Sequence, residues 1–206
     1  MPVPTLKLSL TGLVLILGSL SIQAEDRRLE TLLLLPEPKV MRRALSFSPE
    51  GAELTVLTPA KELTDIPGIM AYSDAEFKKL GLSVETFTQR AKKVADRRLS
   101  TYKPDLIKNE AGQVQYAVYR SEQPLIASLL IAPSLPIIFE QLFGEEIWVA
   151  LPDRHSLFVF PAKPEALAEF TADLADRFRS DPRAASPEIF SIKKGGAPKV
   201  IGSFLD

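Results

Sequence analysis

The clearest pattern of hydrophobic and polar positions lies in residues 73–102 and predicts two consecutive helices. Ser73 and Glu76 have the spacing of a capping box, in which the serine oxygen accepts a backbone N–H and the glutamate reaches back to the cap residue. Gly81 suits the left-handed position that ends this short helix, and Ser83 caps a second helix that extends to about Tyr102. The apolar positions of the second helix recur at three and four and form one stripe, made of Val84, Phe87, Ala91, Val94, Ala95 and Leu99.

The second half of the chain alternates between strand and helix patterns. Residues 113–120 carry apolar side chains at every second position, as expected of a strand with one side in water. Residues 125–132 and 147–151 are nearly continuous apolar runs, which predict strands buried on both faces. Residues 133–144 lie between them, have helical spacing and end at Gly144. This order predicts a β-α-β unit, whose crossover would be right-handed if the two strands are parallel neighbours.

The last third of the chain predicts a hairpin, a helix and a strand. Residues 152–155 form a polar turn into residues 157–160, which predicts a β-hairpin with residues 147–151. Pro164 begins a helix whose apolar residues recur at three and four until Asp181 and Pro182 end it. A final strand at residues 189–192 and a mobile tail at residues 193–198 follow. Five side chains lie on inward faces and should be buried, namely Phe139, Trp148, Leu157, Phe170 and Leu174.

Prolines are predicted to interrupt the secondary structure in the first part of the chain. The apolar run at residues 32–35 is followed by Pro36 and Pro38, which predicts a short helix or strand, then a turn and a short segment at residues 40–47. Residues 53–58 alternate and are β-branched, which predicts a strand that Pro59 stops. All these elements predict an α+β fold with a mixed β-sheet and helices packed on it. We expect a single domain over residues 25–206.

Residues 1–24 have the pattern of a secretory signal peptide. Lys7 precedes an apolar run at residues 8–21, and Ala24 supplies the small residue that a signal peptidase requires. The alternative is an uncleaved membrane anchor, which needs roughly 20 strongly apolar residues, whereas this run includes Ser9, Thr11 and Ser19. The pattern therefore predicts cleavage after Ala24 and a secreted or periplasmic protein.

Composition narrows the classes of function. Removal of residues 1–24 takes away one basic residue and leaves 24 basic and 26 acidic residues, so the net charge of −2 does not attract nucleic acid. The chain has no cysteine and one histidine, His155, which disfavours disulfides, thiolate ligands and a structural zinc site. Because no phosphate loop or calcium loop occurs either, we expect no cofactor and no metal.

Three segments, at residues 80–91, 124–131 and 147–158, occur in an order and spacing that resembles the YtpQ-like bacterial proteins, known as domain of unknown function 1444. The resemblance covers roughly residues 72–192. In that family the turn between the last two strands reads Pro-x-Arg-Asp; here Pro152 and Arg154 match, and His155 stands where aspartate is usual. The resemblance implies a shared fold and no reaction, because the family has no established activity. Whatever role the aspartate has does not transfer.

The turn at residues 153–155 holds the candidate catalytic residues. Asp153, Arg154 and His155 bring together an acid, a fixed cation and the only imidazole, and a neighbouring carboxylate could orient that imidazole as a base. The alternative is a polar turn in which Asp153 bonds its own backbone and Arg154 forms a surface ion pair worth under about 1 kcal/mol. Ser128 is no candidate nucleophile, because it lies in an apolar run without a G-x-S-x-G motif.

The predicted helix at residues 84–103 is basic and carries the candidate partner-binding residues. Six basic residues face two acidic ones, a local charge of +4. Arg90, Lys93 and Arg97 could bind anionic lipid or an acidic partner, whereas the alternative is an ordinary solvated face.

Two hypotheses of function follow from these patterns. The first is an exported, non-enzymatic module that binds a protein or cell-envelope partner through a sheet edge or the basic helix. The second is a small hydrolase-like enzyme centred on Asp153 and His155. An enzyme requires a pocket into which His155 points, with a carboxylate or nucleophile within hydrogen-bond reach.

Overall fold

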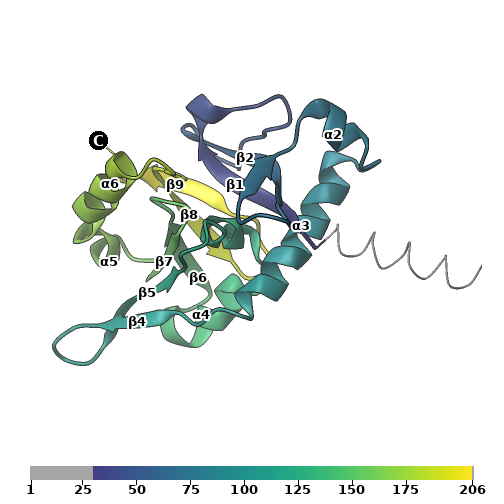
Figure 1. Ribbon diagram of the computed structural model, residues 1–206. Helices are drawn as coiled ribbons and strands as arrows, with labels where there is room; N and C mark the ends of the chain where they lie inside the picture. The colour runs from purple at the N-terminus through teal and green to yellow at the C-terminus, as the bar shows by residue number, and fades with distance from the viewer. Residues whose placement is uncertain (1–29, 206) are drawn as a thin grey trace, which may run out of the picture.

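The computed structural model describes residues 30–205 and contains two antiparallel β-sheets (Figure 1). The small sheet has the order β1–β2–β3, formed by Leu32–Pro38, Thr55–Glu62 and Ile69–Ala71. The large sheet has the order β4–β5–β7–β6–β8–β9. Its strands in chain order are Asp105–Lys108, Val114–Arg120, Glu146–Ala150, Ser156–Pro161, Glu188–Lys193 and Lys199–Ser203. The predicted α+β fold is confirmed, although the sheets are not mixed as predicted, because all of their strand pairs are antiparallel. The predicted signal peptide lies outside the described residues.

Helices cover both faces of the large sheet (Figure 1). One face packs against the 3-10 helix η2 (Ile126–Ile131) and α4 (Leu135–Phe143), and α3 (Val84–Leu99) packs on η2 and β1 within the same core. The other packs against α5 (Pro164–Ala168) and α6 (Thr171–Ser180). Along β5, Ala117 and Tyr119 join the first core and Tyr116 and Val118 the second, so the predicted wet side of this strand is wrong. No helix within residues 30–205 is long and apolar enough to cross a membrane.

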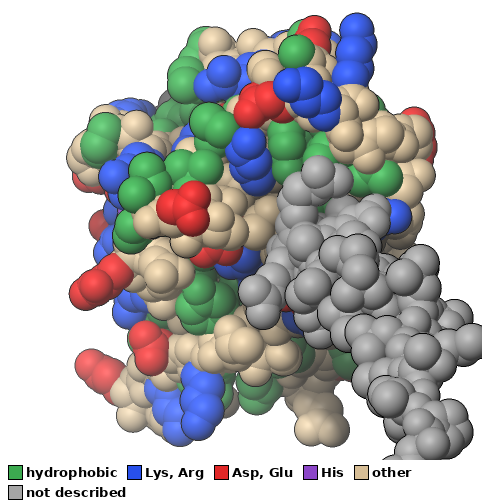
Figure 2. All heavy atoms as spheres, turned by 45° about the vertical axis from the view of Figure 1, so that its right-hand side comes forward, with side chains coloured by type: hydrophobic (Ala, Val, Ile, Leu, Met, Phe, Trp, Pro, Cys, Tyr) green, Lys and Arg blue, Asp and Glu red, His purple; other side chains and the backbone are tan. Residues whose placement is uncertain are grey.

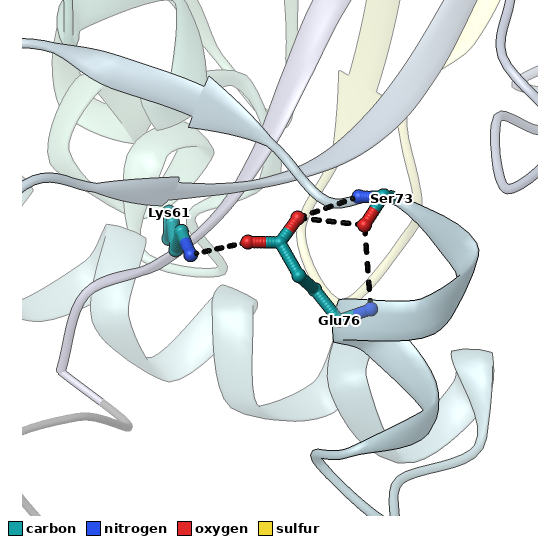
Figure 3. Close-up of polar contacts among 3 residues, drawn as sticks. All are labelled: Lys61, Ser73 and Glu76. Carbon is teal, nitrogen blue, oxygen red and sulfur yellow. Dashed lines mark hydrogen bonds and ion pairs between the residues drawn. The ribbon is translucent and has the colours of Figure 1, made fainter.

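The capping box at the start of α2 (Asp74–Lys78) is confirmed (Figure 3). The backbone N–H and the hydroxyl of Ser73 both donate to Glu76 Oε2, at 3.1 and 2.7 Å, and Glu76 N–H donates to Ser73 Oγ at 3.3 Å. Lys61 on β2 donates to Glu76 Oε1 at 3.0 Å. The Ser73 hydroxyl and then Lys61 stabilise the carboxylate and lower the pKa of Glu76 to about 2. The box therefore joins α2 to the small sheet.

The predicted amphipathic helix is confirmed as α3 and ends at Leu99, three residues before the predicted end. Gly81 has a φ of 65° before it, and Ser83 Oγ accepts the N–H of Thr86 at 3.2 Å. The predicted stripe is buried from Phe87 to Leu99 against η2 and β1.

Prolines do not end the first two strands as predicted. Strand β1 continues through Pro36 to Pro38, and β2 continues through Pro59 to Glu62. Pro36 is paired with Leu57, whose N–H and C=O both bond to Phe47 at 2.7 and 3.1 Å and so point away from β1. The nitrogen of Pro36 therefore faces the outer edge of the sheet, where the ladder needs no N–H.

The predicted β-α-β unit is wrong, because residues 126–131 form the helix η2 and not a strand. All six of its residues are buried, and Ser128 Oγ donates to the carbonyl of Leu125 at 2.6 Å. A continuous apolar run has no period that separates a buried helix from a buried strand. The helix that follows, α4, is confirmed, with Gly144 at a φ of 92° after it.

The final third of the chain agrees in part with the prediction. Strands β6 and β7 form the predicted hairpin, and β8 is the predicted strand at residues 189–192. The last helix is divided into α5 and α6, and the predicted tail is instead a turn that leads into β9. Phe139, Leu157 and Leu174 are buried, whereas Trp148 and Phe170 are only partly buried at the border of the second core.

Buried polar groups join the small sheet to the large one. Glu188 Oε1 on β8 accepts the N–H groups of Glu53 and Leu54, at 2.8 and 2.9 Å. The hydroxyls of Thr55 and Ser186 lie 2.6 Å apart, and Val200 N–H donates to the carbonyl of Glu50 at 2.8 Å. Residues on or next to β8 and β9 therefore fix the position of the segment that leads into β2.

We expect Glu76→Gln to change the acid stability of the protein. A carboxylate whose pKa falls on folding from 4.5 to about 2 stabilises the folded state above the higher value and loses this effect as pH falls to the lower one. Urea denaturation should find the wild type more stable at pH 7, with most of this difference lost near pH 2. The control Glu110→Gln alters an exposed carboxylate that has no ion pair among the described residues, and it should show no such convergence.

We expect Phe139→Ala to cost roughly 3–5 kcal/mol of unfolding free energy, because the ring is buried against Tyr119 and Phe143. Phe170→Ala should cost clearly less, because Phe170 is partly exposed. Chemical denaturation of both variants checks this order, and an equal cost would mean that Phe170 is a core residue after all.

Candidate functional site

The β6–β7 turn is anchored in the protein by Asp153. This side chain is buried; its Oδ1 accepts the backbone N–H of His155 and its Oδ2 accepts the hydroxyl of Ser156, both at 2.7 Å. Both carboxylate oxygens therefore bond within the turn. Asp153 therefore fixes the shape of the turn. Neither of these two hydrogen bonds goes to the imidazole ring of His155.

His155 is half-buried, and its ring contacts two groups from other segments. Nδ1 lies 3.1 Å from the carbonyl oxygen of Ser121, and Nε2 lies 3.3 Å from Nη1 of Arg183. A guanidinium group can only donate, so Nε2 accepts and Nδ1–H donates to the carbonyl. Among residues 30–205 the bonded partners of this ring are thus a carbonyl and a cation, and neither is an acid or a nucleophile.

Arg154 forms an ion pair that is largely withdrawn from solvent. Its Nη2 donates to Glu37 Oε1 on β1 at 2.6 Å, and the two side chains are 20% and 4% exposed. The backbone N–H of Arg154 also donates to the carbonyl of Arg183 at 3.2 Å. The turn therefore connects β1 with the loop after α6, which differs from the surface ion pair considered as the alternative above.

The Glu37–Arg154 pair is incompletely satisfied. Glu37 Oε2 and Arg154 Nε are both buried, and neither has a hydrogen-bond partner within the described part of the chain. A buried polar atom without a partner costs about 1–3 kcal/mol, more when it is charged. Glu188 Oε2, in the other contact between the sheets, is also buried without a partner in this part of the chain, but only the atoms of Glu37 and Arg154 belong to residues that line a cavity.

A cavity of about 450 Å³ opens beside this pair, between the small sheet and the loop at residues 182–184. Three arginines and one glutamate line it, a net charge of +2, although the whole chain is nearly neutral. Apolar residues form the remaining wall. The charged lining is Glu37, Arg43, Arg154 and Arg183, and the apolar lining includes Leu35, Pro38, Val40, Met41 and Ile69. The size is within the usual range of small-ligand sites.

The sequence identified only one of the four charged residues of this cavity, Arg154. Glu37, Arg43 and Arg183 were not predicted, because they lie more than 25 residues from the turn in sequence or on a segment with no motif. Glu37 did carry a signal. A single acid within an apolar strand is rarely buried without a charged partner, so its position alone calls for an arginine or lysine nearby.

The positive charge of the basic helix α3 is partly neutralised by an acidic residue from another segment. Arg97 pairs with Glu30 at 2.7 Å, whereas Arg90 and Lys93 have no ion pair with a described residue. In the coloured part of the face in Figure 2, basic side chains are interspersed with acidic and apolar ones and do not gather in one patch. We therefore take the cavity, and not α3, as the candidate site.

The described residues contain no group of three or more acidic or histidine side chains that could hold a metal ion. Comparisons of the chain with protein-family models, curated proteins and solved structures give no significant match. The resemblance to the YtpQ-like proteins therefore stays a prediction from three segments of sequence.

We expect Arg154→Met to destabilise the protein by roughly 3 kcal/mol, because it leaves the Glu37 carboxylate buried without its cation. The double variant Glu37→Leu/Arg154→Met should recover more than half of this loss, since apolar groups can replace a buried ion pair. Urea denaturation at pH 7 measures both. Equal losses in the single and double variants would show that the lone carboxylate is solvated.

Proposed function

We propose that the protein is an exported, non-enzymatic binding module whose ligand occupies the cavity beside Glu37 and Arg154. The observation that carries this proposal is the coincidence of that cavity with two unpartnered polar atoms of one buried ion pair. Export is supported by the sequence pattern of residues 1–24 alone. Kinship with the YtpQ-like proteins is proposed on the three segments described above and adds no activity.

The hydrolase-like alternative has less support. General-base catalysis needs an imidazole that reaches a nucleophile or water and is oriented by an acid. The Asp153 oxygens are used by the backbone of His155 and by Ser156, and the His155 ring bonds to the Ser121 carbonyl and Arg183. These bonds suit a residue that fixes the position of a neighbouring arginine.

We expect the full chain to bind the apolar anionic dye 1-anilinonaphthalene-8-sulfonate saturably, and Ala71→Trp to weaken this binding at least tenfold. Ala71 lies on β3 and lines the cavity, so an indole there fills it. The matched control is Met70→Trp, since the adjacent strand residue points to the opposite face and does not line the cavity. Dye fluorescence gives the affinity, and the thermal midpoint verifies folding.

Two results would contradict the proposed function. Dye binding that is unchanged by Ala71→Trp would remove the cavity as a binding site. Saturable hydrolysis of p-nitrophenyl butyrate that disappears in His155→Ala, with an unchanged thermal midpoint, would favour the hydrolase instead.

A further inference from the structure

We infer that the ligand of this cavity is the carboxyl terminus of a peptide whose last side chain is aliphatic. The inference rests on the proposed function and adds the chemical class of the ligand. It combines three properties of the lining: an excess of arginine, an unmet pair of one donor and one acceptor, and an apolar wall.

The arginine excess selects a carboxylate. The charge of Arg154 is offset by Glu37, which leaves Arg43 and Arg183 without an acidic partner among the described residues. Nη1 of Arg183 contacts Nε2 of His155, which holds the guanidinium group at the cavity and leaves its other N–H groups available. Planar guanidinium groups bind carboxylates with two parallel hydrogen bonds, which a neutral group cannot match.

The unmet donor and acceptor select a peptide group next to that carboxylate. Glu37 Oε2 lacks a donor and Arg154 Nε–H lacks an acceptor. The end of a peptide chain offers backbone N–H and C=O groups from successive residues, so it can supply a donor to Glu37 Oε2 and an acceptor to Arg154 Nε–H. Since the two atoms are closed to solvent, this pairing requires a change of side-chain rotamer, which is common on binding.

The apolar wall selects the side chain. Val40 is 91% exposed and Met41 48% exposed at the rim, and Leu35 and Ile69 continue the apolar surface inward. Burial of an aliphatic side chain against this rim removes apolar surface from water on both partners. A fatty acid would also use the arginines and the wall, but it has no N–H for Glu37.

The test measures binding of three probes to the full chain by calorimetry: acetyl-Gly-Ala-Val-Leu with a free carboxylate, the same peptide as an amide, and octanoate. The free-acid peptide should bind at least tenfold more tightly than either other probe. Equal binding of the amide would overturn the carboxylate assignment, and equal binding of octanoate would overturn the peptide assignment. In both cases the dye result for Ala71→Trp would still stand, so the proposed function would survive.

A pair of variants then tests the cation. Arg43→Gln should reduce the tenfold preference for the free acid to threefold or less, because Arg43 lines the cavity. The adjacent Arg42→Gln is the control, since Arg42 is also exposed and does not line it. An identical loss of preference in both variants would mean that only the general positive field matters and would overturn the assigned site.

Discussion

The structure depends on the way in which buried carboxylates join the small sheet to the large one. Glu188 on β8 accepts two backbone N–H groups from the segment before β2, and Glu37 on β1 accepts a bond from Arg154 in the β6–β7 turn. Each acid belongs to one sheet and bonds to a segment of the other, so the two contacts fix the relative position of the sheets. The candidate site lies in the space that this junction leaves open.

Burying charged side chains at such a junction costs free energy, so the bonds that these side chains make need an explanation. Burying two charges costs more than burying an apolar pair of similar volume unless every polar atom finds a partner. In the Glu37–Arg154 pair, one oxygen and one nitrogen do not. The pair serves the fold because it joins β1 to the β6–β7 turn, and the proposed ligand would offset part of the cost of burying it by completing its hydrogen bonds.

Much of the fold could be predicted from the sequence wherever the signal was local. The capping box at Ser73, the apolar stripe of α3 and the β6–β7 turn each depend on residues that are close together in the sequence. Prediction failed where the answer depended on a distant partner. Whether Pro36 ends a strand depends on which side of β1 carries β2, and whether Glu37 is solvated depends on Arg154, which lies 117 residues away. The sequence therefore identified only Arg154 among the charged residues of the candidate site.

The prolines of β1 also decide what the small sheet can do in contact with other molecules. Four consecutive leucines in an extended strand make a segment that readily recruits a further strand, and from there aggregates. With Pro36 and Pro38 on the outer edge, two of the donors that an incoming strand would need are missing. The protein can thus use a strongly apolar strand for its core without offering that strand as a template for assembly.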